Sequence, residues 1–161
     1  MSIVVNSAPL ISLAILGQLD LLRTILGEVI VPRAVYDEVI TRGKDKAGYK
    51  DLADVPWFQI AEVGHQELKR SIMVELDEGE AEVICVAKEC SVRRVCIDEF
   101  AGRRYAKLLG LEVIGTLGVL LIAKQKGYVR EIKPCIEKLL ANDRYISTTV
   151  CTEVLRKAEE L

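Results

Sequence analysis

LDEGEAEVICVAKECSVRRVCIDEFAGRRYAKLLGLEVIGT, residues 76–116, predicts a helix, a strand, a second helix and a second strand in that order. The apolar residues Val92, Val95 and Ile97 form a strand pattern that stops at Asp98-Glu99. In open α/β sheets, functional groups gather just beyond the carboxyl ends of parallel strands. Glu80 lies in the first turn of the helix before that strand. We therefore expect acidic residues from several elements to meet at one edge of a sheet.

The rest of the chain repeats this alternation of short apolar runs and helical segments. Strands are predicted at residues 2–5, 29–31, 58–63, 92–98 and 112–114. Helices are predicted at 10–16, 20–26, 33–40, 68–74, 78–90, 99–109, 115–126, 132–140 and 149–160, with a polar connection over 43–56. This pattern is typical of a parallel sheet covered on both faces. We predict one three-layer α/β/α domain over residues 1–161, with a mostly parallel sheet of four or five strands.

The amino-acid composition argues against several classes of function. A net charge of −2 and a pI near 5.6 argue against a strongly basic surface for nucleic acid. Aromatic residues make up 5% of the chain, which argues against recognition of single strands by base stacking. The five cysteines form no CxxC pair, so a zinc site is not expected. We find neither a signal peptide nor a membrane-spanning run, and we expect a cytoplasmic protein.

Glu38 and Asn6 are the first two candidate metal ligands. On a helix from Arg33, Glu38 shares a face with Ala34 and Val35, and a carboxylate on an apolar stripe is costly without a partner or a metal. The alternative is that the stripe ends at solvent and Glu38 is a surface group. Asn6 closes the first strand, where its amide oxygen is either a weak metal ligand or a helix cap.

Glu80 has two competing interpretations. Asp77 and Glu80 have the spacing of a capping box, with Asp77 at the N-cap. Glu80 also shares a helix face with Ile84, four residues on, which places it on the inward side as a ligand would be. Glu82 falls roughly opposite, on the face of Val86.

Asp98 is either the N-cap of the helix that follows it or a functional carboxylate at the end of a strand. Arg103 and Arg104 are either a solvated helix face or a grip for a substrate backbone. The Gly115–Gly118 turn, which contains Thr116, offers backbone N–H groups to a phosphate, but it lacks the lysine of a P-loop. A nucleotide-binding domain is therefore a weaker alternative.

Four segments together resemble the PIN domain superfamily, and more narrowly its DUF3368 group. They are IVVNSAPLISL at 3–13, VPRAVYDEV at 31–39, LDEGEAEVICVA at 76–87 and CIDEFAGRRYAKLLGLEVIGTLGVLLIAK at 96–124. The resemblance implies a three-layer α/β/α fold and metal-dependent ribonuclease activity, in many members as a toxin paired with a small protein antitoxin. It also implies a homodimer, for which the aliphatic C-terminal segments 132–140 and 150–155 are the expected interface.

The resemblance places the acidic ligand positions at Asn6, Glu38, Glu80 and Asp98, with Glu99 as a further ligand. Simple spacing to Ala87 favours Glu82 over Glu80, whereas the inward face favours Glu80. Many active PIN domains carry Asp where this chain has Asn6, so we expect weaker binding of the metal.

The leading hypothesis is an endoribonuclease that uses Mg²⁺ or Mn²⁺, with Glu38, Glu80 and Asp98 as its catalytic carboxylates. Arg103, Arg104 and Thr116 are the expected substrate contacts. The competing hypothesis is a catalytically weak or inactive PIN-like module that binds RNA or a protein partner.

Overall fold

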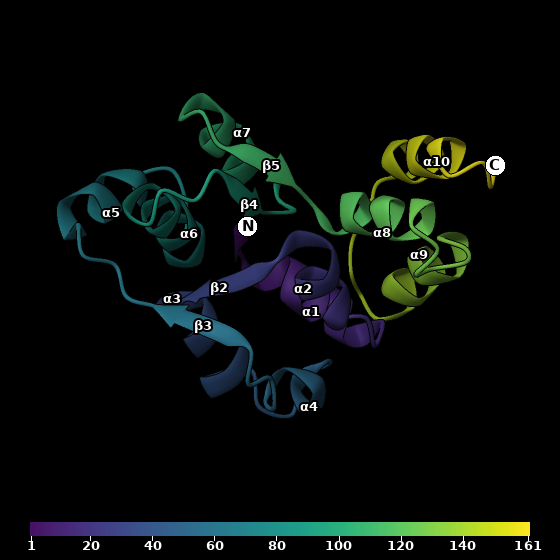
Figure 1. The fold of residues 1–161 in the computed structure, drawn as a ribbon, viewed down its shortest axis with the longest axis horizontal. Coiled ribbons are helices and arrows are strands. Elements are labelled where there is room, and N and C mark those ends of the chain that lie inside the picture. Colours follow the sequence, from purple (N-terminus) through teal and green to yellow (C-terminus); the bar gives the residue numbers. More distant parts are fainter.

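The computed structural model describes residues 1–161 and contains one five-stranded parallel sheet (Figure 1). Its strands are β1 (Ser2–Val5), β2 (Glu28–Pro32), β3 (Phe58–Ala61), β4 (Arg94–Cys96) and β5 (Glu112–Ile114), in the spatial order β3-β2-β1-β4-β5. Every neighbouring pair is parallel. The predicted α/β class and strand number are confirmed, and β3 lies at an edge. The strand predicted over 92–98 is shorter, because only Arg94–Cys96 pair with β5, and of these only Val95 and Cys96 also pair with β1.

Helices cover the sheet on both faces. One face carries α6 (Glu78–Glu89), with α5 (Gln66–Ile72) and α7 (Phe100–Leu108) beside it. The other carries α1 (Ser7–Ile15) and α2 (Asp20–Leu26), against which α8 (Thr116–Gln125) packs. The helices α9 (Lys133–Ala141) and α10 (Thr148–Lys157) lie outside α1 and α8, at the right of Figure 1.

The core is aliphatic, as the composition predicts. β1 is almost wholly buried because helices cover both of its faces, and its residues Ile3, Val4 and Val5 are inaccessible to solvent. No single helix is both long enough and apolar enough to cross a membrane; only α1 and α2 taken together pass such a test, and they are bent by 116°.

The segment after β2 differs from the prediction. In place of one helix over 33–40, α3 (Arg33–Tyr36) continues into a π-helical turn at Asp37–Thr41. The connection predicted over 43–56 contains a short helix, α4 (Tyr49–Leu52), whose Leu52 is buried against the core. A π-helical turn shifts the side-chain register, so the face that Glu38 presents is not the one that a regular helix gives.

Candidate metal centre

Parallel pairing brings the carboxyl ends of all five strands to one edge of the sheet, and the predicted acidic residues follow those ends. Asn6 comes directly after β1, and Glu38 lies in the π-helical turn that follows β2 and α3. Asp98 and Glu99 come after β4. The N-terminus of α6, with Glu80, reaches the same edge because α6 packs against β1, β2 and β4.

Three side-chain oxygens from separate elements surround Gly79. A Cβ atom on Gly79 would lie 3.4 Å from Asn6 Oδ1, 3.5 Å from Glu38 Oε2 and 3.6 Å from Asp77 Oδ1. Ser7 donates a hydrogen bond of 2.6 Å from its hydroxyl to Glu38 Oε2, which fixes that carboxylate against the start of α1. Asn6 is 6% exposed and occupies the N-cap position of α1, but its side chain makes no capping hydrogen bond. Asn6 is therefore the N-cap residue by position, but its side chain does not serve the cap.

A second set of oxygens overlaps the first through Asp77. Asp77, Glu80 and Glu99 each offer a carboxylate oxygen, and these atoms lie within 4.8 Å of one another. Asp77 and Glu80 form the predicted capping box, since Asp77 Oδ1 accepts from Glu80 N at 2.8 Å and Glu80 Oε1 accepts from Asp77 N at 3.3 Å. Because Asp77 belongs to both sets, the oxygens form one continuous group, which we call the acidic cluster: Asn6, Glu38, Asp77, Glu80 and Glu99.

Glu80 is the most unusual member of this cluster. It is 4% exposed, and its Oε2 is buried without any hydrogen-bond partner. Removal from solvent raises the pKa of Glu80 to about 7, and the nearby carboxylate of Asp77 adds to the effect. A buried carboxylate oxygen without a donor is costly, and a cation removes that cost. Gly102 on α7 makes room for this side chain, since a Cβ there would lie 2.5 Å from Glu80 Oε2.

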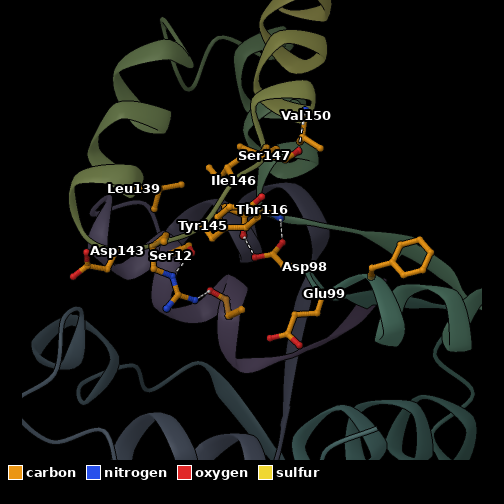
Figure 2. Close-up of a pocket in the computed structure, with 14 residues that line it drawn as sticks. Ser12, Asp98, Glu99, Thr116, Leu139, Asp143, Tyr145, Ile146, Ser147 and Val150 are labelled. Carbon is orange, nitrogen blue, oxygen red and sulfur yellow. Dashed lines mark hydrogen bonds between the residues drawn. The ribbon is translucent and has the colours of Figure 1, made fainter. Parts of the chain in front are cut away.

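Asp98 lies next to this cluster in the chain but is held by α8. Its Oδ1 accepts from Thr116 N and its Oδ2 from Thr116 Oγ1, both at 2.7 Å. Figure 2 shows the Asp98 carboxylate turned toward Thr116, whereas that of Glu99 points the opposite way. Asp98 therefore binds the first residue of α8 and does not cap α7, the helix that follows it, as the alternative interpretation had it.

Glu82 has a different environment from Glu80. It is also buried, but both of its oxygens are paired: Oε1 accepts from Ala34 N at 2.8 Å, and Oε2 accepts from Lys69 Nζ at 2.7 Å. Burial opposes the charge of Lys69, yet its hydrogen bonds to Glu78 and Glu82 raise the pKa of the ammonium group. Glu82 thus joins α6 to α3 and α5 and has no oxygen left without a partner.

The three predicted substrate contacts differ in their burial and in their hydrogen bonds. Thr116 is buried and spends its hydroxyl on Asp98. Arg103 is half-buried and donates to the carbonyl of Ile97, and its guanidinium lies beside Asp98 at the Cα of Gly115. Arg104 is exposed and makes neither an ion pair nor a side-chain hydrogen bond. Of the three, Arg104 alone has a free cationic group.

Asp77 is the cluster member that the sequence did not indicate as a ligand. In the sequence, the N-cap role of Asp77 is enough to explain why an aspartate stands at this position. A signal was available, because an N-cap aspartate uses one oxygen for the cap and keeps the other free.

Oxygen atoms from separate elements at the carboxyl edge of a parallel sheet are an arrangement that can hold a hard divalent cation. The chain belongs to the DUF3368 family, described as a PIN domain, whose family model matches residues 2–160. No curated protein and no solved structure gives a significant match. The PIN assignment supports a nuclease-type fold, and members of this superfamily generally depend on divalent metal ions.

Proposed function

We propose that this protein is a metal-dependent ribonuclease whose metal centre is the acidic cluster together with Asp98. The observation that carries the proposal is the buried, unpartnered Oε2 of Glu80 among other carboxylate oxygens. Membership of the PIN domain family supports the same reaction class. The paired oxygens of Glu82 show that burial alone does not leave a carboxylate without partners in this helix.

The donor set fits Mg²⁺ or Mn²⁺, since hard divalent cations prefer oxygen ligands. Glu38, Asp77, Glu80, Glu99 and Asp98 supply carboxylates and Asn6 an amide oxygen. Once bound, the cation supplies Lewis acidity, which activates water for attack and neutralises charge developing on the phosphate.

The protein's own groups prepare this site. Ser7 orients Glu38, and Thr116 orients Asp98 through two hydrogen bonds, as the partners of metal-binding carboxylates commonly do. We propose that Asp77 provides the negative charge that Asn6 lacks at the end of β1, because the oxygens of both residues lie beside Gly79. Arg104, exposed on α7, attracts the phosphate backbone of the RNA.

The direct test is cleavage of a labelled single-stranded RNA with Mg²⁺, Mn²⁺ or EDTA, using wild type and Asp98→Asn purified in parallel. We expect wild type to cleave only with a metal ion and the variant to lose more than about 100-fold in rate, beyond the loss typical of groups that merely orient ligands. Equal cleavage by both proteins would indicate a contaminating ribonuclease. An absence of cleavage at every metal concentration would contradict the proposal and favour the non-catalytic binding module that the uncharged Asn6 also suggests.

The Gly79→Ala variant distinguishes an effect on metal binding by the acidic cluster from an effect on the stability of the fold. The new methyl group would lie 3.4–3.6 Å from the oxygens of Asn6, Glu38 and Asp77, which is ordinary contact, so the fold accepts it. Alanine in a helix is more stable than glycine by up to about 1 kcal/mol. We expect Gly79→Ala to unfold at a higher temperature than wild type without metal, yet to gain less stability from added Mn²⁺. An equal Mn²⁺-induced shift of the melting temperature in both proteins would show that the metal does not lie beside Gly79.

A further inference from the structure

A cavity of about 620 Å³ is lined by Asp98 and by one member of the acidic cluster, Glu99. Its walls come from the first turns of α1, the turn between β4 and α7, the start of α8, and the connection from α9 to α10 (Figure 2). The proposed chemistry does not use the C-terminal helices. They contribute instead to a pocket that shares Asp98 and Glu99 with the proposed metal centre. Its volume lies within the range of small-molecule sites.

Two of the chain's few aromatic rings stand exposed at this pocket. Phe100 is 80% exposed and Tyr145 is 90% exposed, and both line it. Exposed rings that line a cavity offer faces on which a ligand can stack. Phe100 and Tyr145 come from distant segments of the chain, so only the fold brings both to this pocket.

The charges of the pocket select a neutral occupant. Asp98, Glu99 and Asp143 bring three carboxylates, and Arg144 is the only cation among the lining residues. The guanidinium of Arg144 already donates to Ser12 Oγ at 3.3 Å and to the carbonyl of Ala8 at 3.5 Å. A phosphate group would need a surplus cation in the pocket, and there is none: even with a metal ion on Asp98 and Glu99, the charges of Asp143 and Arg144 only cancel. A flat, uncharged ring that stacks on an aromatic side chain needs no such cation.

We propose that this pocket holds one base of a single-stranded RNA, next to the scissile phosphate, stacked on Phe100 or Tyr145. The assignment rests on the proposed ribonuclease function, because Asp98 and Glu99 join the two sites. A base in a duplex is already paired and stacked, so the pocket selects single strands. The base recognised there sets the position of cleavage along the RNA.

The test measures binding of a fluorescein-labelled single-stranded RNA to the full chain in EDTA, where cleavage is absent. We expect Phe100→Ala and Tyr145→Ala to weaken binding, with a loss of about 5- to 150-fold where a ring stacks on the base. Tyr128→Ala, at an exposed ring outside the pocket, is the matched control and should bind as wild type does. All three positions are exposed, and thermal melting verifies that each variant folds.

A second measurement locates the occupant. RNAs that carry one 4-thiouridine at successive positions are irradiated on the protein, and the crosslinked peptide is identified. We expect a single position, adjacent to the cleaved bond where cleavage occurs, to crosslink to the peptide with Phe100 or Tyr145. Wild-type affinity in both alanine variants, equal binding of duplex RNA, or no RNA binding at all would each overturn the pocket assignment. Pocket-dependent binding without metal-dependent cleavage would instead contradict only the nuclease function.

Discussion

Glu80→Gln is expected to lower metal-dependent RNA cleavage by more than about 100-fold while leaving the protein folded. The amide keeps the shape of the carboxylate and can still accept from Asp77 N, and the backbone N–H at position 80 still donates to Asp77, so both hydrogen bonds of the capping box are preserved. It removes the charge that a divalent cation needs from the most buried member of the acidic cluster. The loss of activity should therefore come without a loss of structure.

The stability of this variant should differ from wild type in a pH-dependent way. The pKa of Glu80 is raised from 4.5 to about 7 in the folded protein, so the folded state holds this proton more tightly than the unfolded state does. The stability gained from the protonated form is complete below about pH 4.5 and is lost as the pH rises through 7. Glutamine does not titrate. We therefore expect metal-free Glu80→Gln to gain stability relative to wild type between pH 5 and pH 8.

Urea unfolding in EDTA across this pH range measures the difference, with Glu137→Gln, at an exposed glutamate on α9, as the control. Parallel pH profiles for wild type and Glu80→Gln would show that Glu80 is not a buried, proton-binding carboxylate in the metal-free protein. The control should follow wild type throughout.

Glu82→Ala is expected to lower the free energy of unfolding by about 3 kcal/mol, whereas Glu80→Gln is expected to gain stability in the metal-free protein. The substitution leaves the Ala34 N–H without an acceptor and removes the 2.7 Å partner of Lys69 Nζ, whose side chain is 13% exposed. Lys69 keeps its hydrogen bond to Glu78 but loses the more buried of its two partners, and together with the unsatisfied Ala34 N–H this is destabilising. For a domain of this size, the loss corresponds to a melting temperature lower by roughly 6–12 °C.

Glu82→Gln provides the matched comparison, because its amide oxygen can still accept from Ala34 N while the ion pair with Lys69 is lost. We expect its stability to lie between wild type and Glu82→Ala in urea unfolding, and both variants to keep Mn²⁺-dependent cleavage below their melting temperatures. Unchanged stability together with lost cleavage would reverse the roles of Glu80 and Glu82. Glu80 is thus expected to serve metal binding, and Glu82, two residues further on, to stabilise the fold.

The sequence predicted the sheet because each strand is a short apolar run, and it predicted the inward face of Glu80 because helical periodicity is regular. It did not predict the partners of Glu82, since Lys69 and Ala34 lie on other elements. The 3.6-residue period placed Glu82 away from Glu80 but could not show that its face is also buried. Burial on both sides of α6 follows from its packing against the sheet on one side and α3, α5 and α7 on the others.

The π-helical turn at Asp37–Thr41 and the placement of Asp98 show a second limit of sequence reasoning. A π-helical turn has no reliable local signature, so the orientation of Glu38 was derived from the wrong helical register. The cap of α8 by Asp98 joins residues eighteen positions apart, and only the pairing of β4 with β5 brings them together. The expected dimer segments are also partly used within the chain, since Ile136, Leu139 and Val154 are buried.

Calorimetric titration of Mn²⁺ into the metal-free protein, at pH 8 and again at pH 6, shows directly whether the acidic cluster holds a divalent cation. We expect binding at pH 8, weaker binding with release of a proton at pH 6, where Glu80 is mostly protonated, and greatly reduced binding by Glu80→Gln at both pH values. Binding of Mn²⁺ that is equal at both pH values and unchanged in Glu80→Gln would contradict this expectation, as would the absence of any binding by wild type at pH 8.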